Sequence, residues 1–216
     1  MPVELGYWKI RGLGANLRYQ LAHCGVAFDD KMYETGDAPD YDKSSWLSVK
    51  FNLGMEFPNL PYIIDGDHKM SETIPIHKYI ADKYKPSLLG SSPEERARIN
   101  MAAGPISELK GKVTMPCYMS GDKAEVHAAM EARLPAIVKF IGDNKFTCGA
   151  EPSWLDFYFF EILELLDWLS DGKVYETHPT LKSLHDNIEN LDGVKAVLEG
   201  QRKLAFNNKM AKLNNM

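Results

Sequence analysis

The chain has 216 residues and a formal net charge of −5, with no run of Lys or Arg, so its charge argues against a nucleic-acid partner. With 44% hydrophobic and 25% charged residues, it has the composition of a globular protein of one large domain or two small ones. It shows no signal peptide and no membrane-spanning stretch, and its three cysteines (Cys24, Cys117 and Cys148) suit a reducing cytoplasm and form no disulfide framework or metal site.

The first 84 residues have the patterns of alternating strands and helices. We predict, in chain order, a strand at 3–9, a helix at 16–23, a strand at 27–33, a polar loop at 35–43, a short helix at 45–50, a hairpin at 62–71 and a helix at 74–84. This order predicts an α/β domain with a mixed four-stranded sheet and helices on its faces, which is the thioredoxin-like arrangement.

The hairpin and the residues around it form a candidate binding site. Asp65-Gly66 favours a tight two-residue turn. A cis bond at Leu60-Pro61 would turn the backbone groups of Asn59 and Leu60 outward, toward a ligand with a peptide backbone. Glu72-Thr73 lies at the start of a helix, where free backbone N–H groups attract anions. An ordinary edge hairpin is the alternative, and both interpretations stay open at this point.

The second half of the chain is predicted to be all helical. Residues 85–91 are predicted to be a linker between a domain at 1–84 and a domain at 92–216. Ser92, Pro93 and Glu95 form a helix-start signal with a capping box. We predict helices at 94–119, 124–141, 154–170, 180–190 and 194–198, with Pro135 interrupting the second. The helix from Trp154 is apolar almost all round, so it is expected in the centre of a bundle.

Tyr7 is a candidate functional residue in a sequence that lacks the common catalytic and nucleotide-binding motifs. The sequence has no Cys-x-x-Cys, no phosphate loop and no dinucleotide fingerprint. Tyr7, beside Trp8, ends the first predicted strand next to a loop with Gly12 and Gly14. A tyrosine hydroxyl can donate to an anion without being consumed. A tyrosine packed on a sheet without a function is the alternative, so the residues alone indicate a two-domain protein with a possible site for a peptide-like anion.

Several stretches resemble one known family closely. They are LGYWKIRGL at 5–13, GDAPDYDKSSWL at 36–47, KFNLGMEFPNLPYIIDGDHK at 50–69 and YIADKY at 79–84, and they are similar to the mu class of cytosolic glutathione transferases. The resemblance is dense over residues 2–84 and looser beyond. It implies a homodimer in which each subunit has a thioredoxin-like domain followed by an all-helical one.

The resemblance also implies a reaction, in which the glutathione thiolate attacks an electrophilic carbon of an apolar compound during detoxification. Glutathione would be a co-substrate, with no prosthetic group and no metal. A free thiol has a pKa of roughly 8.5 and is mostly protonated at neutral pH. Tyr7 matches the catalytic tyrosine of the family, whose hydroxyl would donate to the sulfur and favour the thiolate. Arg18 matches a family arginine that either adds to the field at the thiol or forms a structural ion pair.

Binding residues carry over by position. The resemblance places Tyr7, Trp8, Leu13, Lys43, Trp46, Lys50, Asn59, Leu60, Glu72 and Thr73 at glutathione, together with Glu108, which would reach the glutathione of the partner subunit. The electrophile would contact Tyr7, Trp8, Leu13 and Tyr118. Two positions depart from the family: Lys43 replaces an arginine, and Glu72-Thr73 replaces a Gln-Ser pair, which brings a negative charge to the γ-glutamyl end.

The resemblance assigns Phe57 the role of dimer anchor, inserted between helices of the partner's second domain. The receiving pocket is expected between the helices that begin near Glu94 and Ala124. An isolated exposed phenylalanine is the alternative. Two other functions remain open on the same fold: a non-catalytic binder of apolar ligands and a glutathione-dependent isomerase.

Overall fold

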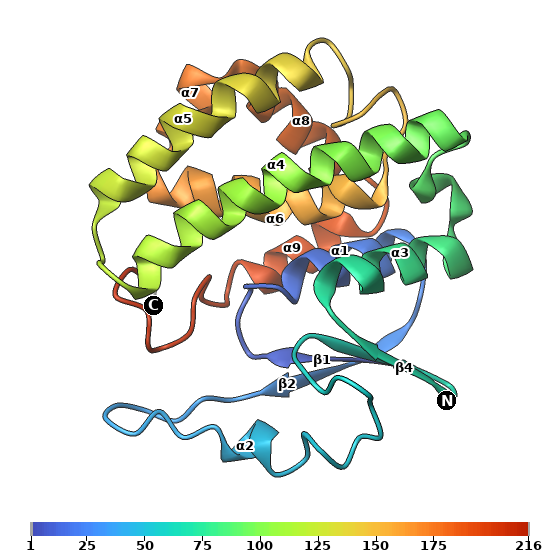
Figure 1. Cartoon of the computed structure of the whole chain (residues 1–216), viewed down its shortest axis with the longest axis vertical. Coiled ribbons are helices and arrows are strands. Elements are labelled where there is room, and N and C mark those ends of the chain that lie inside the picture. Colours follow the sequence, from blue (N-terminus) through green and yellow to red (C-terminus); the bar gives the residue numbers. More distant parts are fainter. Residues whose placement is uncertain (1, 216) are drawn as a thin grey trace.

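The chain folds into a small sheet domain and a larger bundle of helices, which pack directly against each other (Figure 1). The computed structural model describes residues 2–215. The first part contains β1 (Val3–Trp8), α1 (Ala15–His23), β2 (Phe28–Tyr33), α2 (Ser44–Leu47), β3 (Tyr62–Asp65), β4 (His68–Ser71) and α3 (Thr73–Tyr84). The second contains a short 3-10 helix, η1 (Pro86–Leu89), then α4 (Pro93–Tyr118), α5 (Lys123–Ile141), α6 (Trp154–Leu169), α7 (Lys173–Thr177), α8 (Pro179–Glu189) and α9 (Val194–Gln201).

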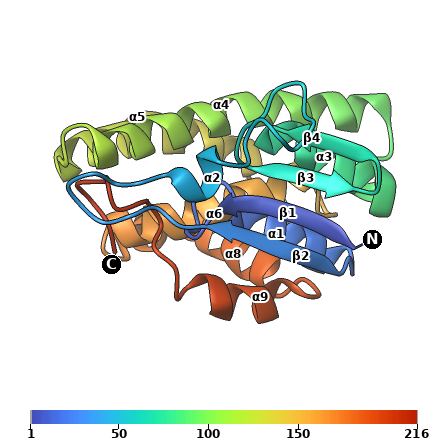
Figure 2. The ribbon, with the colours of Figure 1, turned by 90° about the horizontal axis from the view of Figure 1, so that it is seen from below.

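The sheet confirms the predicted thioredoxin-like arrangement. Its strand order is β2-β1-β3-β4, with β1 parallel to β2 and antiparallel to β3, and β3 antiparallel to β4. Figure 2 shows the sheet from below, with α1 behind it. Helices α1 and α3 cover the face toward the bundle, and α2 lies on the opposite side (Figure 1). The sheet is therefore mixed and four-stranded, as the sequence predicts.

The hairpin turn lies one residue later than predicted. Asp65 pairs with His68, so the two loop residues are Gly66 and Asp67. Gly66 has a φ of +63°, which suits glycine at the first central position of a two-residue turn. The predicted Asp65-Gly66 centre is therefore wrong, because Asp65 still belongs to the strand.

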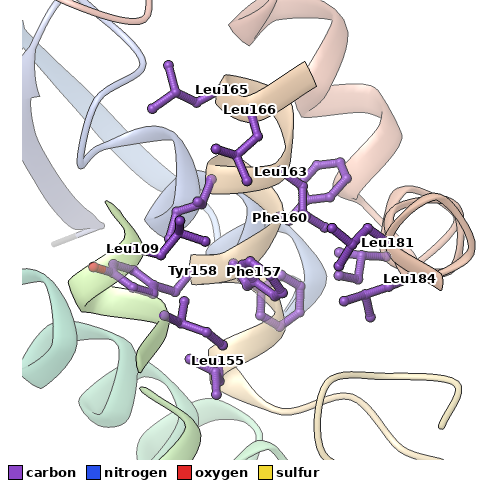
Figure 3. Close-up of a cluster of buried hydrophobic side chains, with 14 of the residues drawn as sticks. Leu109, Leu155, Phe157, Tyr158, Phe160, Leu163, Leu165, Leu166, Leu181 and Leu184 are labelled. Carbon is purple, nitrogen blue, oxygen red and sulfur yellow. The ribbon is translucent and has the colours of Figure 1, made fainter. Parts of the chain in front are cut away.

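Helix α6 is the centre of the bundle, as its apolar sequence predicts. Phe157, Phe160 and Leu163 of α6 are buried with Leu181 of α8, and Leu109 of α4 packs on the other side (Figure 3). A capping box holds its start: the backbone N–H of Ser153 donates to Asp156 Oδ2 at 2.7 Å. Loss of this cap would cost roughly 1 kcal/mol.

Two helical predictions need correction. Helix α5 runs unbroken through Pro135, where we expected an interruption. Proline has no backbone N–H, so the carbonyl of Glu131, one turn earlier, loses its helical hydrogen bond. Both Pro135 and Glu131 are exposed, so water can satisfy that carbonyl. Two short helices were not predicted: η1 lies inside the expected linker, and α7 follows Gly172.

Within residues 2–215, no helix has both the length and the apolar character that a bilayer crossing requires.

Candidate active site

Tyr7 is held at the end of β1 by a loop that can approach it only because two of its residues are glycines. Tyr7 is 6% exposed. A Cβ atom added to Gly12 would lie 2.8 Å from the Tyr7 hydroxyl, and one added to Gly14 would lie 2.7 Å from the ring. Gly12 also has a φ of +42°. The loop between β1 and α1 therefore encloses the tyrosine by close backbone contact.

Burial keeps the Tyr7 hydroxyl protonated. It raises the pKa of Tyr7 to about 12, while a backbone hydrogen bond from Leu13 lowers it. The nearby Tyr118 and Glu161 raise this pKa further, and Arg18 lowers it. At neutral pH the phenol therefore keeps its proton and remains a hydrogen-bond donor.

A cavity of about 360 Å³ opens beside Tyr7, between the two domains. The loop after β1, the inner faces of α4 and α6, and the chain after α9 form its walls. Its lining residues are Tyr7, Ile10, Gly12, Leu13, Ser107, Lys110, Gly111, Thr114, Tyr118, Glu161, Ile162, Leu165, Phe206 and Asn207. Three predicted site residues therefore meet in one cavity: Tyr7, Leu13 and Tyr118. Most of its walls are apolar, as a site for an apolar compound requires.

The segment after α9 closes one side of this cavity through its backbone. The N–H of Arg11 donates to the carbonyl of Ala205 at 2.8 Å, and the N–H of Gly12 donates to that of Phe206 at 3.1 Å. The ring of Phe206 stacks on Trp168 with centroids 5.4 Å apart. The loop that holds Tyr7 is therefore tied by backbone hydrogen bonds to the segment after α9.

Tyr118 stands on the α4 wall, with its hydroxyl engaged by the same segment. The backbone N–H of Asn208 donates to the Tyr118 hydroxyl oxygen at 3.1 Å. Burial raises the pKa of Tyr118. Its hydroxyl hydrogen remains available for another acceptor, so it can donate to a molecule in the cavity.

Arg11 neutralises Glu161, a buried acid that lines the cavity. Its Nε and Nη2 atoms donate to the two oxygens of Glu161, both at 2.9 Å, and Nη2 also donates to Glu164 at 3.0 Å. Tyr19 donates to Glu161 at 3.1 Å. Burial raises the pKa of Glu161, and Arg11 opposes that shift. The forked contact ties the β1–α1 loop to α6.

Arg18 forms the structural ion pair that was one of its two predicted roles. Its Nε donates to Asp30 at 2.9 Å, and its Nη1 donates to the carbonyl of Ile10 at 3.2 Å and to Gln201 at 3.0 Å. It also lowers the pKa of Tyr7 through its charge, as a smaller effect than burial. Arg18 therefore positions the loop after β1 and adds a favourable field at the tyrosine.

Several of the predicted glutathione residues of the first domain share one hydrophobic cluster. Tyr7, Trp46 and Leu60 belong to one buried hydrophobic cluster, against which Trp8 and Leu13 pack. Lys43 directly precedes α2 and Lys50 follows it, and both are part-buried. The bond between Leu60 and Pro61 is cis, as predicted.

Asn59, Glu72 and Thr73 come together at the start of α3. Asn59 is exposed and donates from Nδ2 to Glu72 Oε1 at 3.1 Å, while Thr73 is buried as the first residue of the helix. Glu72 is exposed and has a φ of +79°, an unusual conformation for a residue with a side chain. Such strained positions are enriched in binding sites.

The predicted site residues other than Tyr7, Leu13 and Tyr118 do not line the Tyr7 cavity, and Trp8, Glu108 and Phe57 are among them. Trp8 lines a neighbouring cavity of about 290 Å³ with Lys209 and others. Glu108 points toward α5, where it accepts from Arg133 at 2.6 Å. Phe57 is 77% exposed. A cavity of about 410 Å³ lies between α4 and α5, the helices expected to form the pocket for Phe57, and Glu108 and Arg133 are among its lining residues.

Sequence reasoning missed several residues of the Tyr7 cavity. They are Ile10, Ser107, Lys110, Gly111, Thr114, Glu161, Ile162, Leu165, Phe206 and Asn207. One signal was available: Ser107, Lys110 and Thr114 follow each other at helical spacing on the face of α4 that also carries Tyr118. Phe206 has no such signal, because it follows the last helix and reaches the site through contacts with the first loop and with Trp168 of α6.

Comparison with known proteins agrees with this arrangement. The glutathione S-transferase N-terminal domain model matches residues 3–82, and the C-terminal domain model matches residues 110–201. A glutathione S-transferase of Dermatophagoides pteronyssinus is 38% identical over 213 residues, which covers 97% of this chain and 96% of the relative. Glutathione S-transferase Mu 4 of Mus musculus is 36% identical over 208 residues, with 94% of each chain covered.

Solved structures share the fold. The glutathione S-transferase Blo t 8 superposes with a TM-score of 0.87 at 23% identity, covering 97% of this chain and 99% of that one. The Pi-class enzyme of Onchocerca volvulus gives a TM-score of 0.82 at 24% identity, covering 98% of this chain and all of its own. With two domain models and full-length mu-class relatives in agreement, the chain belongs to the glutathione S-transferase family, in its mu class, and is a transferase that uses glutathione as co-substrate.

Proposed function

We propose that the protein joins the glutathione thiolate to apolar electrophiles, with Tyr7 donating its hydroxyl hydrogen to the sulfur. The observation that carries this proposal is a buried tyrosine, protonated at neutral pH, on the wall of a largely apolar cavity. The sulfur would form the new bond to carbon, and the leaving group would depart with its electron pair. Turnover of a chloronitrobenzene with glutathione tests the proposal, because a non-catalytic binder of apolar ligands would show no enzymatic rate.

Tyr7→Phe is expected to raise the apparent pKa of the bound thiol toward the free value of roughly 8.5. A shift of about 2 units corresponds to about 2.7 kcal/mol of lost preference for the thiolate. The pH dependence of kcat/KM for the electrophile, at saturating glutathione, measures this pKa of the bound thiol. Tyr118→Phe is the control, since its hydroxyl is proposed to meet the electrophile: it should change turnover and leave the thiol pKa in place. An unchanged pKa in Tyr7→Phe would sink the proposed role.

Glutathione is proposed to lie along the first domain, from α2 to the start of α3. Its cysteinyl backbone would pair with Asn59 and Leu60, and Lys43, Trp46 and Lys50 would hold its glycine carboxylate. Thr73 would bind the γ-glutamyl carboxylate, since its hydroxyl lies at a helix start. Trp8 and Leu13 would pack against the ligand. The hydrophobic cluster shared by Tyr7, Trp46 and Leu60 supports this path.

Glu72→Gln is expected to change glutathione affinity only modestly. We propose that the Glu72 carboxylate meets the γ-glutamyl ammonium, and Gln keeps an oxygen that can accept from it and from Asn59 Nδ2. Titration calorimetry measures the affinity, with the exposed Glu56→Gln as a charge-matched control. If Glu72→Gln binds about tenfold more tightly, a gain of roughly 1.4 kcal/mol, then Glu72 repels the ligand and the proposed pairing is wrong.

We also propose a cytoplasmic homodimer, with domains at 1–84 and 92–216 joined by residues 85–91. Phe57 would enter the partner's cavity between α4 and α5. Glu108, on the wall of that cavity, would reach the glutathione of the partner subunit. The exposure of Phe57 and the volume of the receiving cavity support this assembly.

A further inference from the structure

The cavity beside Tyr7 contains a buried cation that the proposed chemistry does not use. Lys110 lies on the α4 wall, and its Nζ atom is buried with no hydrogen-bond acceptor among the described residues. The ring of Tyr158 partly offsets this, with its centroid 5.1 Å from Nζ. An ammonium has three donors and no acceptor, so leaving all of them unused inside a protein is costly.

A second unused donor stands one turn further along the same wall. Thr114 Oγ1 is buried and also has no hydrogen-bond partner within residues 2–215, and Thr114 lines the same cavity. Residues four apart on a helix lie on one face, so Lys110 and Thr114 can act on the same ligand group. Tyr7 and Tyr118 contribute two further hydroxyls to this cavity.

The charge balance of the cavity leaves Lys110 without a counter-ion. Only two charged residues line it among the residues described, Lys110 and Glu161. The carboxylate of Glu161 already accepts two hydrogen bonds from Arg11 and one from Tyr19. Burial lowers the pKa of Lys110 to about 8, with an opposing effect of Glu161, so most Lys110 side chains are charged at neutral pH.

We propose that Lys110 is a specificity residue, and that the cavity selects electrophiles which carry a carboxylate. The inference rests on the proposed transferase function and names its substrate class. The carboxylate would accept from Lys110 and Thr114, while the carbon under attack faces the glutathione sulfur beside Tyr7. Lysine has a long flexible side chain, which lets its ammonium turn from the Tyr158 ring to an anion in the cavity.

A matched pair of substrates tests the inference. The acid is the chloronitrobenzoate with chlorine ortho to the nitro group and para to the carboxylate, and its partner is the methyl ester. In both, the sulfur bonds to the ring carbon and chloride leaves with its electron pair. The measured quantity is the ratio of kcat/KM for acid to that for ester. This ratio should fall by about 10- to 100-fold in Lys110→Met, the range expected for a lost charge-assisted contact.

Two variants control the measurement. Lys110→Arg keeps the charge and should restore most of the ratio. Lys112→Met removes the same charge from an exposed position of the same helix, so it should leave the ratio within about twofold of the parent. Replacing an unpaired buried cation by methionine is not expected to unfold the protein. A ratio in Lys110→Met that matches the parent overturns the inference, even when both substrates turn over.

A binding experiment separates this inference from the proposed function. Nitrobenzoate and its methyl ester have no leaving group, so calorimetry with the glutathione-saturated protein measures affinity without chemistry. Tighter binding of the acid that depends on Lys110 supports the inference even if no substrate turns over, and in that case the proposed function fails alone. Equal affinity for acid and ester, or a preference that survives in Lys110→Met, overturns the inference and leaves the proposed function standing.

Discussion

Phe57→Ala is expected to convert the proposed dimer into monomers and to lower activity together with assembly. By two-fold symmetry each subunit gives one Phe57 and receives one, so a single substitution removes two anchors. Burial of one phenylalanine side chain contributes roughly 1.5–3 kcal/mol. Loss of two would weaken dimerisation by about 3–6 kcal/mol, or roughly two to four powers of ten. Asn59 and Leu60 are near neighbours, so a loosened loop should also weaken glutathione binding.

Analytical ultracentrifugation over a dilution series measures this shift. Phe51→Ala is a matched control, because Phe51 is also 77% exposed and lies in the same connection between α2 and β3. Ala136→Phe would fill the receiving cavity and should give the same monomers from the other side of the contact. A Phe57→Ala protein that remains dimeric at nanomolar concentration would show that another contact holds the subunits.

Arg11→Met is expected to destabilise the folded protein by about 3–5 kcal/mol, the usual cost of leaving a buried charge without its partner. Arg11 is 2% exposed and donates to both oxygens of Glu161, and within residues 2–215 no other arginine or lysine forms a hydrogen bond with Glu161. In a chain of this size the loss corresponds to a fall of roughly 6–20 °C in melting temperature. The β1–α1 loop should loosen as well, because Arg11 lies between Tyr7 and the first helix.

Chemical denaturation of the parent and the variant measures this loss. Lys9→Met is the control: Lys9 and Glu34 form an ion pair with side chains 52% and 68% exposed, and such pairs contribute only about 0–1 kcal/mol. Adding Glu161→Gln to Arg11→Met should recover part of the stability, because the unpaired carboxylate is then gone. If Arg11→Met loses no more stability than Lys9→Met, the buried pair does not stabilise the fold as argued.

The sheet domain was predictable because its signals are local. A glycine in the β3–β4 turn, the alternation of β1, and Gly25 after α1, with a φ of +67°, each specify structure over a few residues. The turn centre was misplaced by one residue because Gly66 suits either central position of a two-residue turn. The pairs Asp65-Gly66 and Gly66-Asp67 are therefore both compatible with a tight turn. Such a choice depends on the register with β4, which the dipeptide alone does not contain.

The interruption expected at Pro135 fails for a physical reason that the sequence does not display. The cost of a proline inside a helix depends on whether the freed carbonyl is buried or hydrated. Glu131, one turn earlier, lies on the exposed face of α5, so its carbonyl can turn to water. Exposure of that face follows from how α5 packs on its neighbours, which is a property of the folded bundle.

The residues of the Tyr7 cavity divide in the same way. Tyr7 could be named as a candidate because strand, tyrosine and glycine loop are adjacent in the sequence. Lys110 and Phe206 were missed because each joins the site through a contact with residues about a hundred or more positions away. The spacing of Lys110 from Tyr118 puts both on one face of α4, but the sequence does not show that α6 covers this face and leaves Lys112 exposed.

The segment after α9 is joined to the Tyr7 loop by main-chain atoms, through Ala205 and Phe206. Any amino acid offers those carbonyls, so the side chains in this segment can be exchanged without detaching it. One wall of the Tyr7 cavity can therefore vary in shape while the tyrosine and its loop stay in place. Phe206 and Asn207 line this wall and are themselves buried, so substitutions there should alter substrate selectivity at a cost in stability, while the main-chain link keeps the Tyr7 loop in place.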